Sequence, residues 1–203
     1  RRYYEVCRDL IRDTAEMFDN PRFLHIGYDE EDLKNQSGHV CIRTGELWWH
    51  DFNFFVKTVE DAGMRPWIWS DYGWEHPEFV DNCPKCVMHS NWYYDGLADG
   101  FDISKMPEDS MSRKRLELFV KLDKAGFEQI PCGTNWCSSY RRKNKLTNDE
   151  CIAGLVKFCR ERVSPANLKG FLVASWPGSE DKPESRKLLF EGIDQLSDAM
   201  RDV

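Results

Sequence analysis

Apolar residues in this chain follow two patterns, the spacing of amphipathic helices and the short continuous runs of buried strands. The helical spacing predicts helices over residues 2–18, 45–62, 113–125, 148–162 and 184–201. The short apolar runs predict strands over residues 23–27, 66–70, 86–91, 128–132 and 170–176. Two of the helices are expected to end at Gly63 and Gly126, because glycine readily adopts the left-handed conformation that caps a helix. Helices and strands are therefore expected to alternate along the chain.

This alternation predicts an α/β fold in which parallel strands are joined by right-handed helical crossovers. The strand starts are spaced by about 37 residues, close to the roughly 31 residues per unit of an eight-unit barrel. A doubly wound open sheet is the competing fold, but the glycine-rich phosphate loops typical of such sheets, GxGxxG and GxxxxGK[ST], are absent. We therefore predict a single domain over residues 1–203, an incomplete (β/α)8 barrel of the TIM type with about five βα units.

Five strands do not close an eight-stranded barrel, so this prediction requires further strands to complete it. The chain opens directly in a predicted helix, which favours about three preceding units in a longer protein. The alternative is a second copy of the chain, so that a homo-oligomer covers the open sheet. No signal peptide is recognised at the start, and the scattered cysteines suit an oxidising or a reducing compartment, so localisation stays open.

The composition limits the classes of partner and cofactor that we expect for this chain. The chain has 203 residues, of which 41% are hydrophobic and 31% charged, as in ordinary soluble proteins. The net charge of −7 predicts no binding to nucleic acid, and the lack of a long apolar run predicts no membrane span. Cys83 and Cys86 have the spacing of a metal or redox pair, but no second pair and no paired His accompany them. We therefore predict a loop thiol pair or a disulfide there, no metal site and no cofactor.

Aromatic and acidic residues gather where the predicted strands end, which is the edge where (β/α) barrels carry their active sites. A flat indole face stacks on the apolar face of a pyranose ring, and a carboxylic acid can donate a proton to a glycosidic oxygen. This combination predicts a sugar-binding pocket. Its candidate residues, in chain order, are His25, Asp29, Glu30, Trp69, Asp71, Trp92, Tyr94, Trp136, Trp176 and Glu180.

The acidic pair Asp29-Glu30 is the strongest candidate for catalysis, because it directly follows an apolar strand and a glycine, Gly27. Neighbouring carboxylates repel each other as anions, which favours protonation of one of them and makes it a usable general acid. His89, by contrast, is interpreted as a packed core histidine. Trp48 and Trp49 lie inside a predicted helix and are expected to serve packing.

The segment His25-Ile26-Gly27-Tyr28-Asp29-Glu30 resembles the His-x-Gly-Gly-Asp-Glu strand end of family-20 glycoside hydrolases, the β-N-acetylhexosaminidases. Position 28 holds a tyrosine where the family motif has its second glycine. Three later stretches are similar to the family's following strands in the same order, so the resemblance runs from about residue 5 to 180 and covers the family's fourth to eighth strands. These stretches are Pro66–Asp71, Val87–Trp92 and Gly170–Trp176, the last with Glu180 nearby.

The resemblance implies an exo-acting hydrolase that removes terminal N-acetylhexosamine by substrate-assisted, retaining catalysis. It implies that Glu30 acts as general acid and then as general base, and that Asp29 orients the substrate's acetamido group. It also implies that Trp69, Trp92, Trp136 and Trp176 wall the acetamido pocket and stack on the sugar.

Two alternatives stay open on the sequence. The first is a glycosidase of another family, in which Glu30 is the acid and Asp71 or Glu180 is the nucleophile or base. The second is a barrel that binds carbohydrate without cleaving it.

Overall fold

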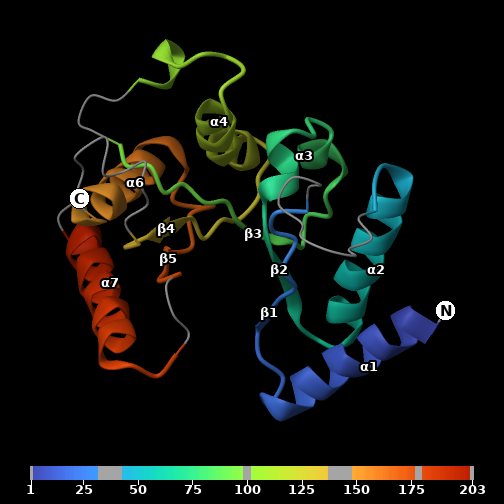
Figure 1. The fold of residues 1–203 in the computed structure, drawn as a ribbon. Helices are drawn as coiled ribbons and strands as arrows, with labels where there is room; N and C mark the ends of the chain where they lie inside the picture. Colours follow the sequence, from blue (N-terminus) through green and yellow to red (C-terminus); the bar gives the residue numbers. More distant parts are fainter. Residues whose placement is uncertain (1, 32–42, 98–101, 137–147, 177–179, 202–203) are drawn as a thin grey trace. The chain divides into compact units, whose positions relative to one another are not determined.

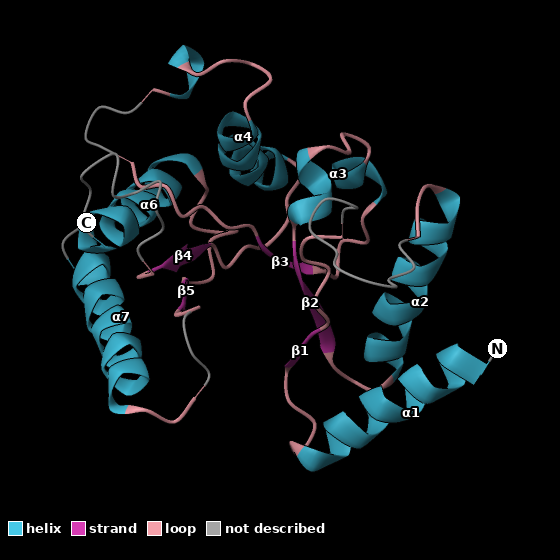
Figure 2. Ribbon diagram, viewed as in Figure 1, coloured by secondary structure: helices cyan, strands magenta, loops and turns pink. Residues whose placement is uncertain are grey.

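The computed structural model describes residues 2–31, 43–97, 102–136, 148–176 and 180–201 (Figure 1). The chain forms two compact units, Arg1–His89 and Ser90–Val203, and each is described by itself. The described helices are α1 (Arg2–Met17), α2 (Glu46–Asp61), α3 (Phe79–Asn82), α4 (Met111–Lys124), α6 (Asn148–Arg162) and α7 (Pro183–Arg201), with short 3-10 helices η1 (Asp71–Trp74) and η2 (Ile103–Lys105). The strands are β1 (Phe23–His25), β2 (Arg65–Trp69), β3 (Met88–Ser90), β4 (Cys132–Thr134) and β5 (Leu172–Ala174) (Figure 2).

The strands form small parallel sheets between the helices, so the predicted α/β class is confirmed. One sheet has the order β1-β2-β3, and the other pairs β4 with β5. The pairs β1/β2 and β4/β5 are parallel, and Trp92 makes a further parallel bridge to Cys132. Neighbouring strands thus follow the order of the sequence. The described residues contain no closed barrel.

The predicted helices and strands are present, with one shift in position. The fourth strand was expected over residues 128–132, but β4 spans Cys132–Thr134. Gln129 makes only an isolated bridge to Leu168. Pro131 has no N–H to donate, so the regular ladder begins after it, where Cys132 lies opposite Leu172. The prediction for this strand was therefore wrong by a few residues.

Glycine ends two of the helices as expected. Gly63 follows α2 with φ 81°, and Gly126 follows α4 with φ 78°. An L-residue with a side chain adopts this left-handed conformation at a cost, whereas glycine does not. Each glycine turns the chain toward the next strand segment.

The core of the first unit has an aliphatic part and an aromatic part. In the aliphatic part, Ile11 and Ala15 of α1 pack with Val59 of α2 and with Met64. In the aromatic part, Trp48 of α2 is 2% exposed, and its ring stacks on that of Tyr72 with centroids 3.7 Å apart. The expectation that Trp48 serves packing is confirmed.

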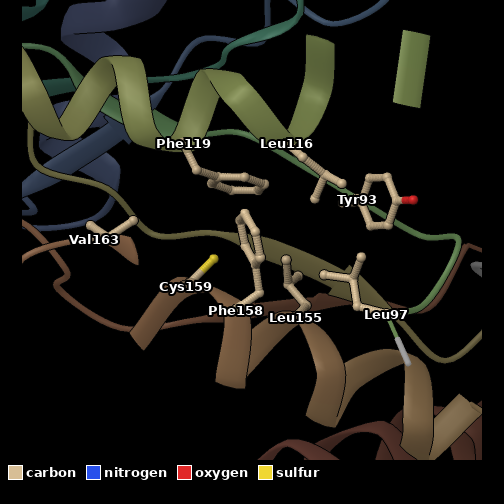
Figure 3. Close-up of a cluster of buried hydrophobic side chains, with 8 residues drawn as sticks. All are labelled: Tyr93, Leu97, Leu116, Phe119, Leu155, Phe158, Cys159 and Val163. Atoms are coloured by element: carbon tan, nitrogen blue, oxygen red, sulfur yellow. The ribbon is translucent and has the colours of Figure 1, made fainter. Parts of the chain in front are cut away.

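One core cluster of the second unit lies between α4 and α6, and another joins α6 to α7 around Ile152, Val156 and Ala199. Figure 3 shows Leu116 and Phe119 of α4 facing Leu155 and Phe158 of α6. The Phe119 and Phe158 rings meet edge to face, with centroids 6.2 Å apart. The complete cluster of buried residues is Tyr93, Leu97, Leu116, Phe119, Leu155, Phe158, Cys159 and Val163. Among the described residues, no helix has the length and the apolar character that crossing a bilayer requires.

His89 is a core histidine, as the sequence predicted. It is 0% exposed, and its Nδ1 lies 3.0 Å from Ser70 Oγ. Its Nε2 lies 3.7 Å from Cys83 Sγ. Burial, with smaller contributions from Lys85 and Arg65, lowers the pKa of His89 to about 3.

We expect this histidine to make the protein less stable in acid. Below pH 6.5 the unfolded chain binds a proton at His89, whereas the folded protein does not do so until about pH 3. Its contribution to the free energy of unfolding should therefore fall by up to about 1.4 kcal/mol per pH unit between those values. Urea unfolding at several pH values from 7 to 4 measures this slope.

The variant His89→Gln should show a shallower acid slope, because Gln does not titrate. His50→Gln removes an exposed histidine of α2 and controls for the loss of an imidazole as such. Equal slopes in the wild type and His89→Gln would contradict the expectation.

Candidate active site

The chain turns sharply after β1, where the predicted catalytic pair lies. Gly27, Tyr28 and Glu30 all have positive φ, at 85°, 73° and 50°. For an L-residue this conformation costs roughly 1–2 kcal/mol, so the surroundings of Tyr28 and Glu30 must offset it. Backbone strain of this kind is concentrated at functional sites in proteins. We call residues 28–31 the acidic turn.

Asp71 anchors the acidic turn through a hydrogen bond to its backbone. The backbone N–H of Glu30 donates a hydrogen bond to Asp71 Oδ2, with 3.0 Å between nitrogen and oxygen. Asp71 is buried at the start of η1, whereas Asp29 and Glu30 are exposed. The sequence placed Asp71 among the substrate-binding residues, and the structure brings it to the backbone of the predicted general acid.

Glu31 ties the other side of the acidic turn to α2. The indole Nε1 of Trp48 donates a hydrogen bond of 2.7 Å to Glu31 Oε2. Although Glu31 is exposed as a residue, burial of its carboxyl group is the main cause that raises its pKa. The hydrogen bond from Trp48 opposes that rise, and the negative charges of Asp51 and Asp29 add to it.

Tyr28, which replaces the second glycine of the family motif, packs against α2. Its ring meets those of Phe52 and Trp48 edge to face, with centroids 5.0 and 5.5 Å away. Burial, together with the charges of Asp51 and Glu31, raises the pKa of Tyr28. The left-handed backbone at position 28 is thus occupied by a side chain that anchors the acidic turn to the core.

His25 lies between two tryptophans at the end of β1. Its ring centroid is 5.0 Å from the rings of both Trp67 and Trp69. The two indoles therefore share a face of β2, as the alternation along the strand predicted. Ile68, between them, is 1% exposed on the other face.

The histidine is held as a neutral hydrogen-bond donor. His25 Nδ1 accepts a hydrogen bond of 3.2 Å from the Gly27 N–H, which places the ring proton on Nε2. Nε2 is buried, and no hydrogen-bond partner for it lies in the described residues. Burial lowers the pKa of His25, and the charge of Asp29 partly offsets this.

In the second unit, two tryptophans emerge from adjacent strand ends. Thr134 of β4 lies opposite Ala174 of β5, so Trp136 and Trp176 follow at matched positions. Their side chains are 44% and 50% exposed. Tyr94 meets the Trp176 ring edge to face, with centroids 6.4 Å apart. These three residues form what we call the aromatic edge of the second unit.

The other predicted residues of this unit have different surroundings. Trp92 is 9% exposed and stacks on Tyr94 with centroids 4.6 Å apart, while the Arg115 guanidinium lies 4.1 Å from the Trp92 ring centroid. Glu180 is exposed and forms an ion pair with Lys182. Trp92 is therefore buried against Tyr94 of the aromatic edge, whereas Glu180 lies on the surface.

Asn135 links the two strand ends of the aromatic edge to each other and to α7. It is 1% exposed, its Oδ1 accepts a 2.9 Å hydrogen bond from Ser175, and its Nδ2 donates to the Leu188 carbonyl of α7. Gly192 makes this approach possible, since a Cβ there would lie 2.8 Å from Asn135 Nδ2. The strand ends that carry Trp136 and Trp176 are thereby fixed to α7.

The described residues contain no group of three or more His, Cys, Asp or Glu that could hold a metal ion. Cys83 and Cys86 are free thiols. Burial and a hydrogen bond involving Glu60 raise the pKa of Cys86 to about 11, and burial raises the pKa of Cys83. At neutral pH these raised pKa values favour the protonated thiol at both positions.

Sequence reasoning missed the residues that support the site. Glu31 was the third acid of a run in which only two were considered. Its partner Trp48 was interpreted as packing alone, and Tyr28 was noted only as a departure from a motif. A signal was available for Glu31, because the negative charges of three consecutive acids repel one another, which favours a hydrogen-bond donor beside at least one of them.

A cavity of about 420 Å³ lies elsewhere, on α1 and α2, and none of the predicted site residues lines it. The predicted site residues lie instead in the acidic turn, at the ends of β1 and β2, and in or near the aromatic edge. Comparison with models of known protein families gave no match, and comparison with curated proteins gave none either.

Proposed function

We propose that this chain supplies the later strands of a (β/α) barrel in an exo-acting glycoside hydrolase that resembles β-N-acetylhexosaminidases. The observation that carries the proposal is the acidic turn itself. Asp29 and Glu30 are exposed at the carboxyl end of a parallel strand, in a strained backbone held by Asp71. His25 and its two flanking indoles lie on the same strand pair.

In the proposed reaction the substrate's own acetamido oxygen attacks the anomeric carbon while Glu30 protonates the leaving oxygen. The bond between the anomeric carbon and that oxygen breaks, and an oxazolinium ion forms. Asp29 orients the acetamido group and stabilises the positive charge. Glu30, now a carboxylate, then takes a proton from the water that opens the ring, so the product keeps the anomeric configuration.

One further feature supports a carbohydrate substrate. The aromatic edge offers the flat indoles of Trp136 and Trp176, which suit stacking on the apolar face of a pyranose. Asp71 is less suited to be a nucleophile, because it is buried and one of its oxygens accepts the Glu30 N–H.

The test compares aryl β-N-acetylglucosaminide and β-N-acetylgalactosaminide with the matched aryl β-glucoside, using the full-length protein. We expect release of the phenol from at least one N-acetylated substrate and none from the glucoside, because the glucoside lacks the attacking acetamido group. Equal cleavage of the glucoside would favour a glycosidase of another family. Binding without cleavage would favour a carbohydrate-binding barrel.

The prediction of additional barrel units, from a preceding segment or from a second copy, stays a prediction. The prediction that residues 1–203 form a single domain likewise stays a prediction.

A further inference from the structure

Residues from three segments form a closed series of contacts around Glu30. The Glu30 N–H binds Asp71, the first residue of η1, and the next residue, Tyr72, stacks on Trp48 of α2 with only 10° between the ring planes. Trp48 in turn donates its indole N–H to Glu31, the neighbour of Glu30. The series therefore begins and ends at the acidic turn.

These contacts hold the backbone on both sides of Glu30, in a conformation that the residue does not favour. The φ of 50° at Glu30 is left-handed, and a non-glycine residue keeps it only when its surroundings enforce it. Trp48 is 2% exposed and Asp71 8% exposed, so both partners are fixed in the core.

From this geometry we infer that Asp71 is a positioning residue for the general acid, acting through the Glu30 backbone N–H, and does not contact the substrate. The inference rests on the proposed function. It differs from the role predicted from the sequence, which placed Asp71 at the sugar. A displacement of a reacting group by about 1 Å can cost roughly 100-fold in rate.

The variants Asp71→Ala and Asp71→Asn separate the two roles. Asn keeps an oxygen that accepts the Glu30 N–H, whereas Ala does not. We expect Asp71→Ala to lower kcat roughly 10- to 100-fold with KM nearly unchanged, and Asp71→Asn to restore most of the rate. Asp81→Ala, an exposed acid of α3, is the matched control and should behave as the wild type.

The leaving group gives a second kinetic readout. A dinitrophenyl leaving group needs little protonation, whereas a phenyl leaving group depends on the general acid. The loss in Asp71→Ala should therefore be large for the phenyl glycoside and small for the dinitrophenyl glycoside. Equal losses for both substrates, an increase in KM with kcat kept, or equal damage in the Asn and Ala variants would each overturn the inference.

Amide hydrogen exchange of Glu30 tests the same contact without any substrate. We expect exchange at this amide to be faster in Asp71→Ala by roughly tenfold, and near the wild-type rate in Asp71→Asn. Unchanged exchange in Asp71→Ala overturns the inference. If the wild type cleaves no N-acetylhexosaminide, the proposed function fails, and the exchange result still decides whether Asp71 holds Glu30.

Discussion

Replacing Glu30 with glutamine should lower kcat for aryl N-acetylhexosaminides by about 10²- to 10⁴-fold, the usual contribution of a general acid. Gln has the same shape but cannot deliver a proton to the leaving oxygen. The fold should be kept, because Glu30 is exposed and the observed bond to Asp71 uses its backbone N–H. Steady-state kinetics over a range of pH, together with circular dichroism, measure both effects.

Two further variants make this result specific. Asp29→Asn should also lower kcat, since it removes the charge proposed to stabilise the oxazolinium ion. Glu46→Gln changes an exposed acid in the first turn of α2 and should leave the rate as it is. If the wild type is active and neither Glu30→Gln nor Asp29→Asn changes its rate, the assigned site is wrong.

Replacing Phe119 with alanine should destabilise the protein by about 3–5 kcal/mol, because it leaves a cavity in a core that cannot fully collapse. Phe119 is 0% exposed and contacts the Phe158 ring in the cluster between α4 and α6 (Figure 3). A loss of this size is a large part of the roughly 5–15 kcal/mol that stabilises a typical domain. Denaturant unfolding measures the change.

Phe190→Ala is the matched comparison, since that phenylalanine of α7 is 62% exposed. Its free energy of unfolding should change by no more than about 0.5 kcal/mol. Similar losses in the two variants would mean that the described core does not carry the stability of the second unit.

The order of helices and strands could be predicted because each element has a period that local sequence encodes. The five predicted helices were found within a few residues of their expected bounds, and Gly63 and Gly126 ended two of them. The fourth strand was displaced because pairing with Leu172, far along the chain, decides where its ladder begins. Short helices such as α3 and η1 are too brief to show a period.

The candidate site was predictable in its parts but not in its internal contacts. A strand followed by a glycine and acids marks Asp29 and Glu30 as candidates from local sequence alone. The partner of Glu30, by contrast, lies 41 positions away at Asp71, and the bond uses a backbone N–H that every residue except proline carries. The type of side chain at position 30 therefore gives no indication of the contact with Asp71. The stacking of Tyr72 on Trp48 likewise depends on two elements meeting in space.

The aromatic edge has an optical consequence. The chain has eight tryptophans, all of them within the described residues, and only Trp136 and Trp176 are more than a third exposed. Their indoles emit at longer wavelength than the shielded ones, so a molecule that covers the edge should shift the fluorescence of the whole protein to the blue. The chain thus carries its own reporter of occupancy, which needs no label and no turnover.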